Sequence, residues 1–263
     1  MPDASPFDRH DVLSLLFHPR PGLPVPEETD SCFDLFIPGH DGERLAIRCH
    51  LAGKELPTLL FFHGNGEVAS DYDELAPHLT RCGFNFIIAE YRGYGLSRGE
   101  PTVSHMLADA KTAFTFMEGW LKNREFHGPM VVMGRSLGSA PALELAAAFQ
   151  ERIHGLVLES GFARFIPLLH TIGLPQWVDL PHESEGPANL AKISTYKRPL
   201  LVIHADEDAI IPFHEGEDLF EASPSTEKRF LEVKNAGHND VFYVGHRDYL
   251  DALSHLSHSL LSP

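Results

Sequence analysis

Cysteine is scarce in this chain of 263 residues. Cys32, Cys49 and Cys82 lie far apart and include no C-x-x-C pair. An odd number of widely spaced cysteines disfavours both a disulfide framework and a zinc site of the zinc-finger type. We therefore expect the protein to occupy a reducing compartment.

Long apolar runs are also lacking. The longest one near the N-terminus spans residues 12–17 and is interrupted by Ser14, so it is shorter than the core of a signal peptide. No stretch approaches the roughly 20 apolar residues that a membrane-spanning helix needs. These observations predict a cytoplasmic protein with no integral membrane segment.

Positive charge is in short supply. The chain has 21 Lys and Arg residues and 37 Asp and Glu residues, which gives a formal net charge of -16. A nucleic-acid backbone or an anionic bilayer would repel most of such a surface. We therefore expect no nucleic acid among its partners.

Apolar residues, in contrast, make up 43% of the chain, enough for one large α/β domain. We expect residues 1–263 to form this single domain. Four prolines fall between Pro19 and Glu28 and disfavour a helix there. Residues 1–30 are accordingly predicted to be an extended N-terminal arm that lies on the domain.

The first regular structure is predicted to be antiparallel. Two stretches of alternating polarity, residues 32–37 and 45–50, flank the turn-rich sequence G-H-D-G at 39–42. Alternating stretches joined by such a spacer indicate a hairpin.

Beyond residue 57 the pattern changes to short apolar runs separated by helical patterns. Runs of this kind are typical of strands buried on both faces. Their alternation with helices predicts an α/β fold with a mostly parallel sheet, helices on both faces and ligands at the carboxyl ends of the strands. The runs span residues 58–62, 85–89, 130–133, 156–158, 200–203 and 230–233, and the helical patterns span 72–81, 103–122, 137–149, 211–220 and 242–256.

Residues 162–189 interrupt this alternation. The segment is long, broken by prolines and rich in large apolar side chains. Long insertions in compact domains are commonly functional lids, so we predict a small cap inserted after the sixth strand. An irregular loop whose apolar residues pack on the core is the alternative.

A nucleophile is predicted at the end of the fifth strand. The sequence G-R-S-L-G at 134–138 lies between an apolar run and an alanine-rich helical pattern. In this context a tight turn exposes the serine, and the helix N-terminus favours negative charge. We expect Ser136 to be the nucleophile; the alternative is an ordinary strand-to-helix turn.

A serine nucleophile needs a base and an acid, which follow it along the chain in this architecture. The strand at 200–203 runs into a loop with Asp206, Glu207 and Asp208, any of which could be the acid. His238 follows the last strand, on a loop at the same edge of the sheet. We expect His238 to be the general base rather than a solvated loop residue.

The strand at 58–62 ends in the glycine-rich sequence H-G-N-G at 63–66. Acyl-transfer sites bind the oxyanion with two backbone N–H groups, one from the residue after the nucleophile and one from such a loop. Leu137 and Asn65 are the predicted donors. The glycines alone would indicate only a turn.

Several motifs together resemble the α/β-hydrolase superfamily. The similar branch contains small serine hydrolases with an H-G-N loop and a G-R-S-x-G elbow, among them protein depalmitoylases and acylglycerol esterases. The resemblance implies the α/β-hydrolase fold over nearly all of the chain after the arm. The motifs are H-G-N-G-E at 63–67, E-Y-R-G-Y-G-L-S at 90–97, G-R-S-L-G at 134–138, H-A-D-E-D-A-I-I-P at 204–212 and A-G-H-N-D at 236–240.

The resemblance also selects the acid. In the family motif H-G-x-x-D-x-x-[VI]-P the acid aligns with Asp208, whereas Ala205 stands where the family usually has glycine. Tyr91, Arg92 and Tyr94 correspond to positions that brace a loop in the family, so a structural role is implied for them.

The sequence thus predicts a serine hydrolase that cleaves a small-molecule carboxylic ester or thioester through an acyl-enzyme on Ser136. No cofactor and no metal are expected, because a metal site formed by His204, Asp206, Asp208 and His238 is disfavoured by the nearby serine and by family precedent. The oligomeric state is unknown at this stage.

Two other functions stay open. One is an aminopeptidase-like or amide hydrolase with the same triad, in which Glu183 and Glu185 would pair with a substrate amine. The other is a non-catalytic binding protein that keeps only the fold.

Overall fold

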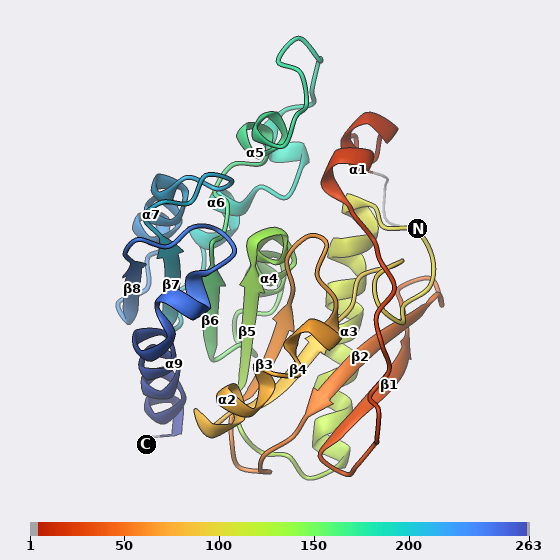
Figure 1. The fold of residues 1–263 in the computed structure, drawn as a ribbon, viewed down its shortest axis with the longest axis vertical. Helices are drawn as coiled ribbons and strands as arrows, with labels where there is room; N and C mark the ends of the chain where they lie inside the picture. Colours follow the sequence, from red (N-terminus) through yellow and green to blue (C-terminus); the bar gives the residue numbers. More distant parts are fainter. Residues whose placement is uncertain (1–4, 262–263) are drawn as a thin grey trace.

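A computed structural model describes residues 5–261 and contains one eight-stranded sheet in the order β1-β2-β4-β3-β5-β6-β7-β8 (Figure 1). The β1–β2 and β2–β4 pairs are antiparallel, and all the other pairs are parallel. The mostly parallel sheet predicted from the sequence is therefore confirmed. The strands are β1 (Cys32–Pro38), β2 (Arg44–His50), β3 (Thr58–Phe62), β4 (Asn85–Ala89), β5 (Met130–Arg135), β6 (Gly155–Glu159), β7 (Leu200–Ala205) and β8 (Lys228–Val233).

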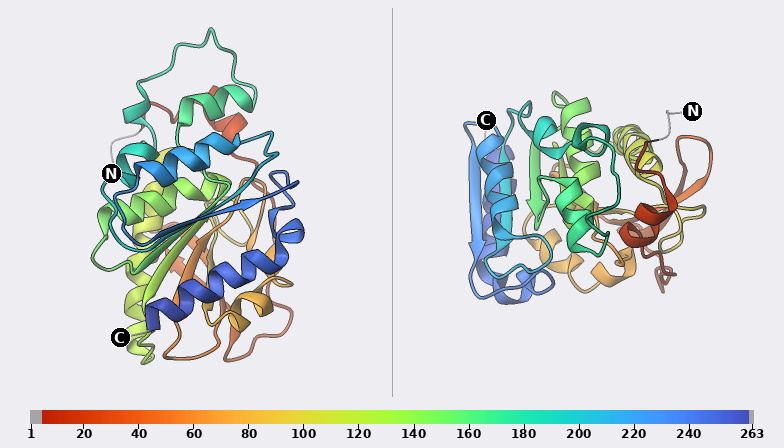
Figure 2. Two further views of the ribbon diagram at one scale, coloured as in Figure 1. Left: turned by 90° about the vertical axis from the view of Figure 1, so that its left-hand side faces the viewer. Right: turned by 90° about the horizontal axis from the view of Figure 1, so that it is seen from above.

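Helices cover both faces of the sheet (Figure 2), as expected for strands that are apolar on both sides. In β3, Leu60 and Phe62 point into the core beneath α3 and α4, while Leu59 and Phe61 point into the core beneath α2 and α9. The helices are α1 (His10–Leu16), α2 (Ala76–Arg81), α3 (Val103–Asn123), α4 (Ser139–Ala148), α5 (Phe165–Thr171), α6 (Asn189–Ile193), α7 (Phe213–Ala222), α8 (Val241–Val244) and α9 (His246–Leu261).

The predicted N-terminal arm is extended only in part. Residues 1–4 lie outside the described residues, and helix α1 occupies His10–Leu16. Val12 and Leu16 lie four residues apart, so both are on the buried face of this helix. After α1 the chain runs extended over the domain, where Pro21 forms a bridge with Gly95.

The segment predicted to be a cap contains regular structure. Helix α5 buries Phe165, Leu168 and Leu169, and a 3-10 turn follows at Glu183–Glu185. The ring of Phe165 packs edge-on against Phe7 from the N-terminal segment, at 5.1 Å between ring centroids. The insertion and the start of the chain thus lie together beyond the carboxyl ends of the strands (Figure 1).

Within residues 5–261, none of the helices combines the length and the apolar character that crossing a membrane requires.

Glu90, directly after β4, is a buried carboxylate that helps to shape this end of the sheet. Its Oε1 accepts a hydrogen bond from the Ala69 N–H at 2.7 Å, while Oε2 has no partner among the described residues. Gly95 lies against the same carboxylate, because a Cβ added there would be 2.0 Å from both oxygens. Burial raises the pKa of Glu90 to about 7.

We predict that Glu90 makes the free energy of unfolding depend on pH. Between pH 4.5, the ordinary pKa, and about 7, the folded state keeps a proton that the unfolded chain releases, so stability falls as the pH rises through this range. Glu90→Gln should remove this decrease in the free energy of unfolding, which amounts to about 3 kcal/mol. The variant should therefore gain stability relative to wild type between pH 5 and pH 8, as measured by urea unfolding.

Glu221 is exposed on α7, and Glu221→Gln serves as the surface control. If the difference in the free energy of unfolding between Glu90→Gln and wild type stays constant from pH 5 to pH 8, Glu90 does not cause the pH dependence.

Candidate active site

Ser136 occupies a strained turn between β5 and α4. Its φ is +51°, in the left-handed region that residues with a Cβ rarely adopt. The flanking glycines allow the close approach of the backbone at this turn. A Cβ on Gly134 would lie 2.1 Å from the Gly138 carbonyl oxygen, and a Cβ on Gly138 would lie 2.0 Å from that of Phe62. The G-x-S-x-G pattern therefore has a steric cause.

The structure brings Ser136, His238 and Asp208 into one hydrogen-bonded chain. His238 Nδ1 lies 2.7 Å from Asp208 Oδ2, and His238 Nε2 lies 2.9 Å from Ser136 Oγ. Because a carboxylate only accepts, Nδ1 carries the proton and Nε2 is left to accept from the serine hydroxyl. Asp206 and Glu207, the other acids in this loop, are exposed.

Asp208 is held in place by its own loop. Its Oδ1 accepts the backbone N–H groups of Ile210 and Ile211 at 2.9 and 2.8 Å. Burial alone would raise the pKa of Asp208, but the hydrogen bond and charge of His238, together with these N–H groups, lower it below its ordinary value. The carboxylate therefore stays ionised and can stabilise a histidinium.

His204, considered above with the alternative metal site, has a different role. Its Nε2 donates to the Ile211 carbonyl oxygen at 2.8 Å, so this nitrogen is not available as a ligand. Burial lowers the pKa of His204, which keeps the ring neutral. The contact instead supports the loop that holds Asp208.

A cavity of about 230 Å³ opens beside Ser136. Asn65 and Leu137, the two predicted oxyanion donors, both line it, and its apolar wall comes from α1, α5, the residue after α5 and the Asp208 loop. The lining residues are Leu16, Asn65, Arg135, Ser136, Leu137, Leu168, Ile172, Ile210, His238 and Asn239.

The N-terminal arm contributes to this site, which the sequence analysis did not anticipate. Leu16 lines the cavity, and His18 holds the side chain of Asn65. Asn65 Oδ1 accepts from the His18 N–H at 2.9 Å and from the Tyr94 hydroxyl at 2.7 Å, and Asn65 Nδ2 lies 2.7 Å from His18 Nδ1. No sequence motif predicts these contacts, because they join segments that are far apart in the sequence.

Arg135 connects two loops around Ser136 with the end of β6. Its guanidinium donates to the His238 carbonyl oxygen at 2.9 Å, to Glu159 Oε1 at 3.1 Å, and to Glu67. Glu67 in turn accepts the Gly64 N–H at 2.6 Å, so the glycine-rich loop is part of the same network.

Burial alone would lower the pKa of Arg135, but the surrounding acidic groups, including Glu67 and Glu159, raise it. The side chain therefore remains a cation.

An arrangement with a serine, a histidine of fixed tautomer and an ionised carboxylate can activate the serine hydroxyl for attack on a carbonyl carbon.

Known proteins are similar to this chain in sequence. Residues 53–181 match the family described as "Hydrolase_4: Serine aminopeptidase, S33". Alpha/beta hydrolase domain-containing protein 17B from Homo sapiens is 32% identical over 223 residues, which cover 81% of this chain and 70% of that protein. An uncharacterized protein from Mycobacterium tuberculosis is 31% identical over 249 residues, with 91% and 84% covered.

Solved structures share the fold. An esterase from Pyrococcus furiosus superimposes with a TM-score of 0.72 at 17% identity, covering 92% of this chain and all of the other. A soluble variant of monoglyceride lipase from Saccharomyces cerevisiae gives a TM-score of 0.66 at 15% identity, covering 89% and 98%. The sheet order, the helical layers and the sequence relatives agree that this chain belongs to the α/β-hydrolase family.

Proposed function

We propose that the protein is a serine hydrolase that cleaves a carboxylic ester or thioester through an acyl-enzyme on Ser136. The observation that carries the proposal is the hydrogen-bonded chain from Ser136 Oγ through His238 to Asp208, at 2.9 and 2.7 Å. His238 Nε2 takes the serine proton as Oγ attacks the carbonyl carbon, and Asp208 stabilises the resulting imidazolium. His238 then protonates the leaving group, and water hydrolyses the acyl-enzyme.

The negative charge that develops on the carbonyl oxygen is assigned to the backbone N–H groups of Asn65 and Leu137. Both residues line the cavity beside Ser136, which supports this assignment. Removing one donor of this type typically costs about 3 to 4 kcal/mol of transition-state stabilisation. In this proposal, His18 and Tyr94 act indirectly, because they fix the side chain of Asn65.

The substrate is proposed to carry an apolar acyl chain. Leu16, Leu168, Ile172 and Ile210 form an apolar wall of the cavity, and two of them belong to residues 162–189. We therefore assign this segment as a small cap on a single domain. The names of the structural neighbours, an esterase and a monoglyceride lipase, support an ester as the substrate, as expected of the depalmitoylase and acylglycerol-esterase branch.

An aminopeptidase is the rival suggested by the description of the matching family. A free substrate amine would require an unoccupied carboxylate near the cavity. Glu183 instead accepts the N–H groups at the start of α5, that of Ile166 at 2.9 Å and that of Phe165, and Glu185 accepts the His182 N–H at 2.9 Å. Since both carboxylates are used as caps, the ester reaction is favoured.

The three cysteines are all free thiols. We infer a reducing, cytoplasmic location from the odd number and wide spacing of these cysteines.

The first test compares wild type with Ser136→Ala. Wild type should react with a fluorophosphonate probe and hydrolyse p-nitrophenyl esters, whereas the variant should lose labelling, and its kcat should fall by about 10⁴-fold or more because the nucleophile is gone. Ser259→Ala, an exposed serine near the end of α9, is the matched control and should behave as wild type. Unchanged turnover in Ser136→Ala would exclude this mechanism, and faster cleavage of peptide amides than of esters would favour the aminopeptidase.

A second prediction concerns the arm. Leu16→Trp should fill part of the cavity and reduce kcat/KM for octanoyl esters relative to acetyl esters by about 10-fold or more, because each methylene that loses its apolar contact costs about 0.8 kcal/mol. Ser14→Trp places the same side chain on the exposed face of α1 and should leave the ratio unchanged. An equal loss for both esters in Leu16→Trp would mean that the acyl chain does not lie against α1.

A further inference from the structure

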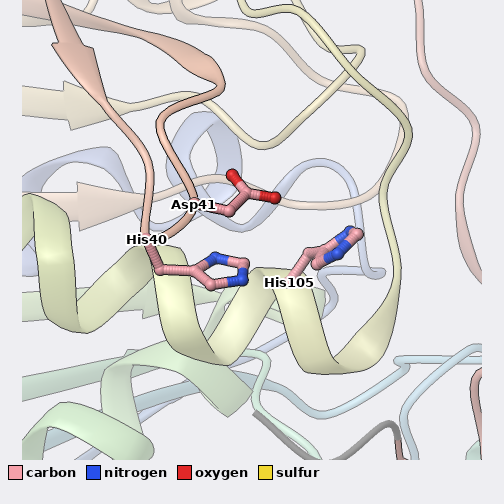
Figure 3. Close-up of side chains that lie close together, drawn as sticks. All are labelled: His40, Asp41 and His105. Atoms are coloured by element: carbon pink, nitrogen blue, oxygen red, sulfur yellow. The ribbon is translucent and has the colours of Figure 1, made fainter. Parts of the chain in front are cut away.

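A group of potential metal ligands lies outside the cavity of Ser136. His40 and Asp41 belong to the turn between β1 and β2, and His105 lies in the first turn of α3 (Figure 3). One ring nitrogen of each histidine and one carboxylate oxygen of Asp41 all lie within 4.8 Å of one another. Two imidazoles and one carboxylate form a donor set suited to zinc and related divalent ions.

His40 is already in a form that can bind a metal. Its Nδ1 lies 2.7 Å from Oδ1 of Asp109, a buried carboxylate that also accepts from Arg92 Nε at 2.7 Å. Arg92 Nη2, which can only donate, also lies 3.1 Å from Nδ1. Because Asp109 can only accept and makes the shorter contact, we assign the proton to Nδ1, which leaves a lone pair on Nε2 and no hydrogen bond between Arg92 and this ring. A carboxylate behind the second ring nitrogen is the usual arrangement around metal-binding histidines.

The turn that carries His40 is fixed on the same carboxylate. The His40 N–H donates to Asp109 Oδ1 at 2.9 Å, and the Gly39 N–H donates to the Glu43 carbonyl oxygen at 2.7 Å. A Cβ on Gly39 would lie 2.8 Å from Asp109 Oδ1, so the turn packs tightly against α3. One ligand is therefore held in place before any ion binds.

Asp41 and His105 have room to complete the coordination. Asp41 is exposed and His105 is half-buried. His105 Nδ1 lies 3.2 Å from the Glu100 carbonyl oxygen, which can only accept, so His105 Nε2 has a lone pair for a metal ion. With metal–ligand bonds of about 2.0 to 2.1 Å, tetrahedral ligand atoms lie about 3.3 Å apart, so the separations between these atoms would have to shorten by at most about 1.5 Å.

The local charge also favours a cation. Arg92 donates to Asp41 Oδ1 and Oδ2 at 2.7 and 3.0 Å and places one positive charge beside the group. Asp41 and Asp109 supply two negative charges, which leaves a net formal charge of -1. Asp41 Oδ1 also accepts the Glu43 N–H at 3.1 Å, whereas Oδ2 accepts only from Arg92 and keeps a second lone pair for a ligand bond.

We propose that His40, Asp41 and His105 bind one divalent transition-metal ion of the zinc class, with water as the remaining ligand. The ion joins the β1–β2 turn to the first turn of α3 and stabilises the fold. None of the three ligands lines the cavity of Ser136, so the site is separate from the proposed catalytic one.

The test uses the full chain after treatment with a chelator. Titration with Co²⁺ should produce the visible absorption of a tetrahedral site at one ion per chain, Zn²⁺ should displace the Co²⁺, and Zn²⁺ should raise the Tm. His40→Ala and His105→Ala should each weaken Zn²⁺ binding by more than about 100-fold. This loss exceeds the one expected for a residue that only hydrogen-bonds to a metal ligand. His255→Ala, an exposed histidine on α9, controls for binding by other histidines.

Circular dichroism without metal establishes that each variant is folded before it is titrated. Absence of a tetrahedral Co²⁺ spectrum in wild type, or equal Zn²⁺ affinity in wild type and both histidine variants, would overturn the proposal. Because the readouts are absorption and Tm, failure here leaves the proposed hydrolase activity unaffected.

Discussion

The left-handed backbone at Ser136 is the constraint on which the rest of the site depends. The chain leaves β5 and enters α4 so abruptly that a Cβ on either Gly134 or Gly138 would collide with a backbone carbonyl oxygen. The turn raises the serine hydroxyl above the sheet edge, where the loops after β3, β7 and β8 also end. A parallel sheet thus gathers side chains that are more than a hundred residues apart into one hydrogen-bonded chain.

Arg135 links the serine turn to the loops after β3 and β8. Its guanidinium lies between Glu67 and Glu159 and also bonds to the carbonyl oxygen of His238, so the elbow, the glycine-rich loop and the histidine loop share one cation. Arg135 is buried, so removing one of these partners would leave a buried charge that is less well compensated, which is costly. These bonds support the strained serine turn, to which no cysteine contributes.

The fold was largely predictable from the sequence, whereas part of the site was not. Short apolar runs such as 58–62 and 85–89 identified the central strands because both of their faces are buried. Residue spacing alone could not separate Asp206 from Asp208, since the choice depends on which carboxylate turns inward. The contributions of Leu16 and His18 were missed, because they depend on how the arm packs on a distant loop, and seven residues were too short a pattern to reveal α1.

The central claim is that Ser136 forms the acyl-enzyme. The most direct measurement is to quench the wild-type protein in acid during turnover of an activated ester and to map the acyl group by peptide mass spectrometry. The account predicts a mass increase equal to the acyl group on the peptide that contains Ser136 and on no other peptide. Sustained turnover with the acyl group on a different residue, or with no covalent adduct at all, would contradict it.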